Sequence, residues 1–132
     1  MNFNNKESRV PGAEHGFLQA LVKPDENIVL EIGEGLWVLD RMHRKMFANE
    51  SSVDLSGREF GLVGLLASSP GIFFNDQNII TRWEQMSDKR STSGVVKVIV
   101  YRVRKKFERI GLPGCIESER KVGYRLRAHA ID

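Results

Sequence analysis

Cationic side chains recur between positions 97 and 109, and their types favour one kind of chemistry, the binding of anions. Those that helical spacing places away from the apolar residues are Lys97, Arg102, Arg104, Lys105 and Arg109. An arginine presents a planar fork of N–H donors that fits a phosphate or another flat hydrogen-bonding edge, whereas a lysine acts as a point charge. A row of such groups suits a polyanion, because each phosphate that is neutralised releases a condensed counterion.

The segment from Ser93 to Ile110 is predicted to be the helix that positions these cations. Its apolar residues fall at helical spacing and form a stripe on the opposite face: Val96, Val100, Val103 and Phe107. Three residues before the stripe are candidates for the N-cap: Ser91, Thr92 and Ser93. Gly111 has the position of a C′ glycine, and Pro113 prevents the helix from resuming.

The basic residues are concentrated in one part of the chain. The 132-residue protein has a formal net charge of +3, but the stretch from Lys89 to Arg127 holds 12 Lys or Arg against three Asp or Glu, and the remainder holds 8 against 14. This asymmetry indicates a localised surface for a polyanion. The alternative is a solvated basic face, which single helices often have.

Enzyme chemistry is not indicated by the motifs. His15, His43 and His129 are dispersed, and the sequence lacks HExxH, GxSxG and a glycine-rich phosphate loop. We therefore expect neither an enzyme nor a cofactor. Cys115 is the one cysteine, so no disulfide within the chain is expected. No run approaches the roughly 18 apolar residues of a membrane span, so we expect a cytoplasmic protein without membrane association.

Before the basic helix, the sequence predicts a leader, a small sheet and two helices. Residues 1–26 show no clear period and are expected to be flexible, with a role that the sequence leaves open. Between positions 27 and 55, period 2 with intervening turn residues predicts three or four short antiparallel strands. Ser56 and Glu59 form a capping box at the start of a first helix, which ends near residues 68–71.

A second, shorter helix is predicted after Asn75, its N-cap residue. Its core-facing residues are Ile79, Ile80 and Trp83. The preceding residues 72–74 are apolar and are expected to form a buried connection. Residues 84–93 are expected to be a polar loop, so that two helices, a connection and the basic helix make a helix-turn-helix arrangement.

The C-terminal part is predicted to be a β-hairpin. Strand-like alternation begins at Cys115, breaks between Arg120 and Gly123, and resumes at Tyr124 and Leu126. The tip therefore carries Arg120 and Lys121. We expect one α+β domain over residues 27–128, with residues 1–26 as leader and 129–132 as tail.

In order and spacing, residues 28–127 resemble the OmpR/PhoB-type winged helix-turn-helix, the effector domain of many bacterial response regulators. The matching stretches are Leu39-Asp40, residues 53–60 (VDLSGREF), 70–73 (PGIF), 102–107 (RVRKKF) and 120–126 (RKVGYRL). The resemblance implies an N-terminal antiparallel sheet, three helices and a C-terminal hairpin wing. It also implies a transcriptional regulator that binds double-stranded DNA, with the third helix in the major groove and the wing in the adjacent minor groove.

Roles follow partly from the resemblance and partly from residue type. By position, Arg102 matches a base-contacting arginine, Arg104 a phosphate-contacting one, Arg120 the wing arginine and Ser118 a hydroxyl on phosphate. By type, Lys97, Lys105 and Arg109 suit phosphates, and Val98 or Ile99 suits a thymine methyl group. Lys121, the second cation of the wing tip, is also expected among the DNA-binding residues. Tyr101 is open between a phosphate contact and packing on the next helical turn.

Further partners are implied only by the resemblance. The 84–93 loop matches the segment through which relatives touch RNA polymerase, and relatives bind tandem half-sites as pairs. Three positions depart from the family pattern: Lys97 where an acid is frequent, Ile99 where a polar residue is frequent, and Lys121 where glycine is frequent. Residues 1–26 are too few for a receiver domain, so the chain is either a stand-alone regulator, which we favour, or an effector domain cut from something longer. In both cases we expect no response of this chain to a phosphoryl donor.

One rival interpretation uses the same fold. A winged-helix interaction module, an adaptor or anti-activator, would present the third helix to a protein. Val98 and Ile99, apolar residues on or beside the outward face, favour it, and the excess of cations opposes it.

Overall fold

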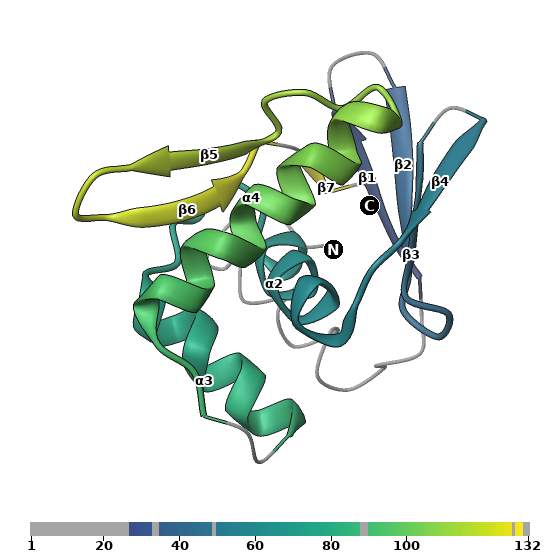
Figure 1. The fold of residues 1–132 in the computed structure, drawn as a ribbon. Helices are drawn as coiled ribbons and strands as arrows, with labels where there is room; N and C mark the ends of the chain where they lie inside the picture. Colours follow the sequence, from purple (N-terminus) through teal and green to yellow (C-terminus); the bar gives the residue numbers. More distant parts are fainter. Residues whose placement is uncertain (1–26, 33–34, 49, 88–89, 128, 131–132) are drawn as a thin grey trace, which may run out of the picture.

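The computed structural model describes residues 27–32, 35–48, 50–87, 90–127 and 129–130, so the predicted leader lies outside the described residues. Figure 1 shows a sheet on one side, a group of helices beside it and a two-stranded wing that projects from the helices. Four strands come first: β1 (Ile28–Ile32), β2 (Gly35–Asp40), β3 (Lys45–Ala48) and β4 (Ser51–Asp54). Each pairs antiparallel with the next, which confirms the predicted short antiparallel strands.

The sheet has a fifth strand, β7 (His129–Ala130), which pairs antiparallel with β1. The strand order is β4-β3-β2-β1-β7. These two residues fall in the stretch that we expected to be a tail after the domain. Their pairing joins the two ends of the described chain in one sheet.

Three helices follow: α2 (Gly57–Ser68), α3 (Asp76–Met86) and α4 (Ser93–Arg109). Helices α2 and α4 contact the sheet, and α3 packs against α2 and α4 (Figure 1). Alternate residues of β2 and β3 point into the core, with Trp37, Leu39 and Met46 almost fully buried. The Trp37 ring meets the Phe107 ring edge to face, with centroids 5.4 Å apart, which couples the sheet to α4.

Helix α2 begins at the predicted capping box. The Ser56 hydroxyl accepts from the Glu59 N–H (3.3 Å), and the Glu59 carboxylate accepts from the Ser56 N–H (2.7 Å). Every residue from Gly61 to Ser68 is buried, because the sheet, α3 and α4 enclose this helix. At Gly61, an added Cβ would lie 2.8 Å from the Trp83 ring, so the glycine permits the close approach of α3.

The segment between α2 and α3 differs in part from prediction. Ile72 is 45% exposed and Phe73 and Phe74 are half-buried, so the connection is not a buried one. The chain there turns outward to meet the wing, which leaves the Ile72 side chain in solvent. Asn75 caps α3 as predicted, and Ile79, Ile80 and Trp83 are core residues. Helix α3 extends to Met86, so the loop begins at Ser87 and not at residue 84.

The wing consists of β5 (Ile116–Glu119) and β6 (Gly123–Leu126), an antiparallel pair that confirms the predicted hairpin. Strand β6 is hydrogen-bonded to the segment before α3. Phe74 and Tyr124 exchange two backbone hydrogen bonds of 2.8 Å each, and the Gly71 N–H donates to the Leu126 carbonyl (2.9 Å). The wing is therefore an extension of the helical core.

Candidate nucleic-acid interface

Helix α4 buries the predicted stripe and presents the opposite face to solvent. Val96, Val100, Val103 and Phe107 are all core residues. Thr92 is the N-cap, although its side chain makes no cap hydrogen bond. At the other end, Gly111 has φ +82°, the conformation expected of a C′ glycine.

The exposed face of α4 combines cations with two apolar side chains. Val98 is 47% exposed and Tyr101 is 61% exposed. Lys97, Arg102, Lys105 and Arg109 are also exposed. Lys105 lies 5.5 Å above the Tyr101 ring and 3.7 Å from the Glu108 carboxylate, so part of its charge is already balanced.

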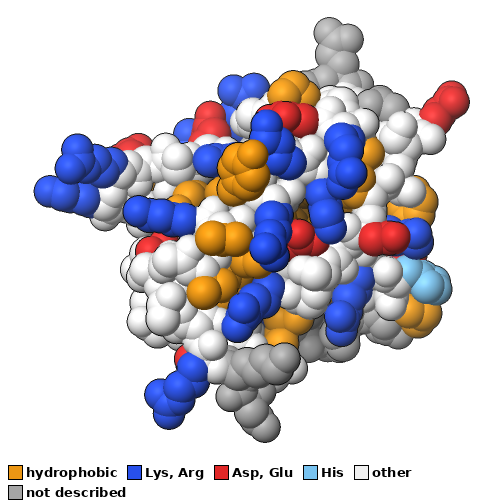
Figure 2. All heavy atoms as spheres, viewed as in Figure 1, with side chains coloured by type: hydrophobic (Ala, Val, Ile, Leu, Met, Phe, Trp, Pro, Cys, Tyr) orange, Lys and Arg blue, Asp and Glu red, His pale blue; other side chains and the backbone are white. Residues whose placement is uncertain are grey.

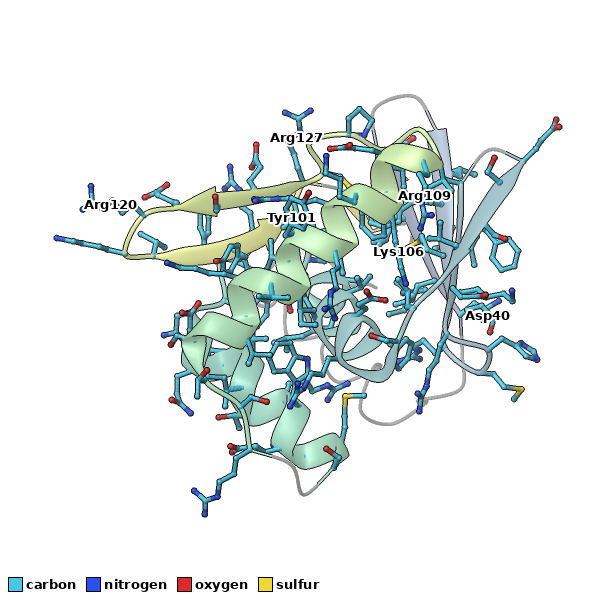
Figure 3. The ribbon with its side chains drawn as sticks, in the orientation of Figure 1. Asp40, Tyr101, Lys106, Arg109, Arg120 and Arg127 are labelled. Carbon is cyan, nitrogen blue, oxygen red and sulfur yellow. The ribbon has the colours of Figure 1, made fainter. Side chains whose placement is uncertain are left out.

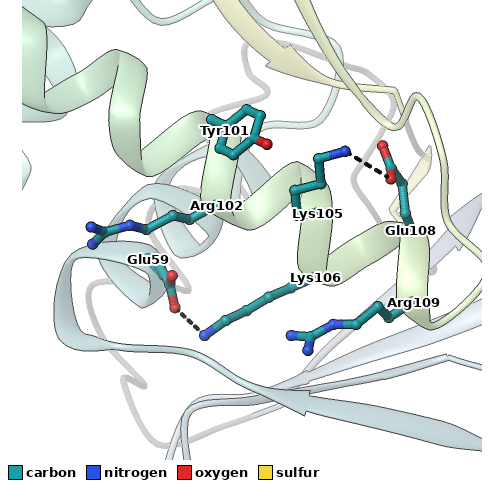
Figure 4. Close-up of a pocket in the computed structure, with 7 residues that line it drawn as sticks. All are labelled: Glu59, Tyr101, Arg102, Lys105, Lys106, Glu108 and Arg109. Atoms are coloured by element: carbon teal, nitrogen blue, oxygen red, sulfur yellow. Dashed lines mark hydrogen bonds and ion pairs between the residues drawn. The ribbon is translucent and has the colours of Figure 1, made fainter.

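Arg102 and Arg109 differ from Lys105 in being unpaired. Among the residues that the structure describes, neither has a hydrogen bond or ion pair. Both line an open hollow of about 500 Å³ with Glu59, Tyr101, Lys105, Lys106 and Glu108 (Figure 4). The two guanidinium groups lie on the side of α4 that faces α2, whereas Tyr101 lies on the other side. These arginines are free to accept an anionic partner without first breaking a contact.

Ile99 does not belong to this face, which corrects one residue of the expected DNA-binding set. It is 4% exposed and is part of the core. Its spacing from Val96 and Val103, three and four residues, places it on the buried stripe. Of the neighbours Val98 and Ile99, Val98 lies on the exposed face of α4 and Ile99 does not.

Arg104 is also placed differently from the expectation of a free phosphate contact. Its Nε and Nη2 both donate to the Ile116 carbonyl, at 3.2 and 2.9 Å. The side chain is half-buried between α4 and the base of the wing. The guanidinium fork therefore holds β5 against the helix.

Lys106 makes contacts that the sequence did not predict. Its Nζ donates to the Glu59 carboxylate (2.6 Å) and to the Asp54 carbonyl (2.7 Å). Burial of the Glu59 carboxylate opposes its ionisation, but the hydrogen bonds from Lys106 and from Ser56 outweigh burial and hold the pKa of Glu59 below its ordinary value. This cluster fixes α4 to the start of α2 and to the end of β4. The capping box identified Glu59 in the sequence, but no local pattern linked it to Lys106.

The wing carries its cations at the free end. In Figure 3, Arg120 projects at the tip, away from the helices, and Tyr101 faces out of α4 beside the wing. Arg120, Lys121 and Ser118 are exposed. Lys121 has φ +66°, a left-handed conformation that glycine adopts more easily, and this gives a physical reason for the glycine expected from the family pattern.

Arg125 and Glu117 brace the middle of the wing. The Arg125 Nε lies 2.7 Å from the Glu117 carboxylate, and its guanidinium lies 4.6 Å from the Phe73 ring centroid. These contacts use the charge of Arg125 within the wing. The tip cations Arg120 and Lys121 have no such contact, since no hydrogen bond or ion pair engages either side chain among the described residues.

One face of the molecule gathers the free cations. Figure 2 shows Lys and Arg side chains across α4 and at the wing tip on the same visible face, with apolar side chains between them. The described residues hold no cluster of three or more His, Cys, Asp or Glu that could bind a metal ion. Burial raises the pKa of Cys115 to about 12, so its thiol is neutral and poorly nucleophilic near pH 7.

The sheet, the helices and the hairpin with a basic third helix define a winged helix-turn-helix of the OmpR/PhoB type. Residues 49–126 match the family described as "Transcriptional regulatory protein, C terminal", and the chain belongs to this family. It is a class of DNA-binding regulatory domains and not of enzymes. None of the helices within the described residues is long and apolar enough to cross a membrane.

Individual relatives agree with this assignment. The heme response regulator HssR of Staphylococcus saprophyticus is 30% identical over 106 residues, which are 78% of this chain and 46% of that protein. The chain thus spans about half the length of this relative. The DNA-binding domain of Escherichia coli CadC has a TM-score of 0.64 at 22% identity, over 79% of this chain and 95% of that one. The Klebsiella pneumoniae RstA DNA-binding domain in complex with RstA box has a TM-score of 0.57 at 22% identity, over 74% and 95%.

Proposed function

We propose that this chain binds double-stranded DNA sequence-specifically, with α4 in the major groove and the wing in the adjacent minor groove. The observation that supports it is the position of unpaired cations at two places on one face, the outward side of α4 and the wing tip (Figure 2). Duplex DNA presents phosphates on both sides of each groove, so one surface of this shape neutralises several at once. Its RstA neighbour, solved with RstA box, agrees with this use of the fold.

Residue roles divide between reading bases and contacting the backbone. Arg102 is assigned to a guanine edge, because its fork is unpaired and exposed. Val98 is assigned to a thymine methyl group. Lys97, Lys105 and Arg109 are assigned to phosphates, and Ser118 to a phosphate beside the wing. Arg120, at the end of a narrow hairpin, suits an A/T-rich minor groove, whose narrow walls concentrate negative potential.

The direct test is binding to a selected site and to scrambled DNA at two salt concentrations. With about five phosphate contacts, log K falls against log salt with a slope of about −4 to −5. Arg102→Ala lowers affinity by about 1–3 kcal/mol on the selected site and relaxes the preference at one base pair, whereas Lys105→Ala weakens both DNAs and reduces the slope by about one. Arg120→Ala affects mainly sites with A/T-rich flanks. If all three variants lost affinity equally on both DNAs, α4 would bind DNA through charge alone, without reading its sequence.

Val98 and Tyr101 favour one other candidate, a protein-interaction module. Exposed apolar side chains in the centre of a face are typical of protein contacts. A flat salt titration on DNA would favour that module. Contact with RNA polymerase through the 84–93 segment and pairing on tandem half-sites belong to the DNA-binding proposal as further partners. Residues 88 and 89 of that segment lie outside the described residues.

A further inference from the structure

The two edges of the wing are held by different means. On one edge, β6 exchanges backbone hydrogen bonds with Phe74, so this side is continued by the main chain of the helical core. On the other edge, β5 has no strand beside it among the described elements. Arg104 of α4 supplies the contact at that edge, through two hydrogen bonds to the Ile116 carbonyl.

The geometry of the hairpin explains why this carbonyl needs a side-chain donor. The Cys115 carbonyl accepts from the Arg127 N–H (2.7 Å), so this carbonyl points toward the side of β6. Successive residues of a strand direct their carbonyls to opposite sides, and the Ile116 carbonyl therefore points to the free edge. Ile116 is itself buried, so its carbonyl would lack a partner without the guanidinium.

A contact at Ile116, the base of the wing, affects the position of the tip, because a small rotation at the base becomes a larger displacement at the tip. Arg120 lies four positions after Ile116, which corresponds to about 13 Å at the rise of a β-strand. A rotation of about 10° at the base would move the tip by about 2 Å over that length. Such a shift is enough to take a guanidinium out of hydrogen-bonding range of a groove.

We propose that Arg104 is a positioning residue that sets the angle between α4 and the wing, so that both reach adjacent grooves of one duplex together. The inference rests on the proposed function. It assigns Arg104 to the wing and not to a phosphate, since two of its donor groups are engaged within the protein. Arg104 then acts on DNA through Arg120, which it does not itself touch.

The test compares Arg104→Lys, Arg120→Ala and the double variant. Lysine keeps the charge and loses the fork. Binding is measured to two duplexes with the same centre and either A/T-rich or G/C-rich flanks. The matched control is Arg58→Lys, since Arg58 is also half-buried and donates to a backbone carbonyl, that of Arg90 (3.4 Å), but lies on α2.

If Arg104 positions the wing, Arg104→Lys and Arg120→Ala each reduce the preference for A/T-rich flanks, by about tenfold for a groove contact of ordinary strength. The double variant shows no further loss. The salt slope of Arg104→Lys also falls by about one, although no charge has been removed. Arg58→Lys keeps the wild-type preference. The ratio of the two affinities does not depend on the folded fraction, and a melting curve for each variant measures that fraction separately.

Three results would overturn the inference while leaving DNA binding intact. The first is a full flank preference in Arg104→Lys. The second is independent losses that multiply in the double variant, because Arg104 would then act apart from the wing. The third is an Arg120→Ala variant that binds both duplexes like wild type, since the tip would then contribute nothing. Failure of the wild-type chain to bind either duplex would instead refute the proposed function.

Discussion

Gly123 is the position at which a single methyl group should separate the wing from the core. It has φ +142°, a conformation that side-chain-bearing residues rarely adopt. An added Cβ would lie 2.2 Å from the Phe74 carbonyl oxygen and 2.9 Å from the Asn75 Cα. These are backbone atoms, so the neighbouring chain cannot yield by changing a rotamer. Gly123→Ala therefore forces β6 away from the segment that precedes α3.

The magnitude follows from what is lost. Backbone strain at such a position costs about 1–3 kcal/mol. The paired hydrogen bonds between Phe74 and Tyr124 contribute about 0.5–1.5 kcal/mol each. We expect Gly123→Ala to lower the free energy of unfolding by about 3 kcal/mol, a large part of the 5–15 kcal/mol typical of a small domain. Urea denaturation measures this as a lower midpoint at unchanged slope.

Gly64→Ala provides the control, because an added Cβ there meets no atom within 4 Å. Gly64 lies within α2, where replacing glycine by alanine stabilises a helix by about 0.5–1 kcal/mol. The two substitutions are thus expected to shift the midpoint in opposite directions. Equal midpoints for Gly123→Ala and wild type would show that the close approach of β6 to residues 74–75 does not hold the wing.

Three further variants test other parts of the molecule. Glu59→Gln should lower stability by about 1.5–3 kcal/mol at pH 7, as for a hydrogen bond to a charged group. The pKa of Glu59 is depressed in the folded state, so the stability difference between wild type and Glu59→Gln is complete above the ordinary pKa of 4.5. It shrinks as the pH falls through the folded-state pKa. Urea unfolding of both proteins at pH 7 and at pH 3 measures this change. Lys121→Gly should raise the melting temperature slightly, since the left-handed conformation costs a lysine about 1–2 kcal/mol. The gain is only partial, because glycine has more conformational freedom in the unfolded chain. An unchanged or lower melting temperature speaks against strain at the tip. Replacing thymine by deoxyuridine in the selected site should weaken binding by the wild-type protein about fourfold, the effect of one buried methyl group. The affinity of Val98→Ala should not change with this replacement. Equal sensitivity in both proteins would show that Val98 does not contact the thymine methyl group.

The elements that could be predicted from the sequence are those specified by neighbouring residues. The capping box of Ser56 and Glu59 and the stripe ending at Phe107 involve positions within one helix, so α2 and α4 were predicted close to their observed bounds. The hairpin was also predicted, because alternation and a break at residues 120–123 are local features. Family resemblance supplied the arrangement of these pieces, which local patterns do not contain.

What the sequence did not reveal depends on contacts between distant parts of the chain. Strand β7 pairs with β1 across about a hundred residues, and a two-residue strand has no period of its own. The contacts of Arg104 with Ile116 and of Lys106 with Glu59 arise only once the elements are packed. In a list of basic residues both look like exposed cations. Ile99 is a different case, since its spacing from Val96 already indicated burial.

The pairing of β7 with β1 places the two ends of the domain side by side. Leu30 is opposite Ala130 and Glu31 is opposite His129, so the chain enters β1 from the same end of the sheet towards which β7 leaves. Adjacent strands lie about 4.8 Å apart. The path of the backbone is therefore almost a closed ring, and a circular permutant that joins these ends and opens a surface turn elsewhere would keep every pairing described. A module fused before β1 or after β7 would also be attached at the same point of the fold. Its place relative to bound DNA would therefore be nearly the same, whether it precedes or follows the domain in the sequence.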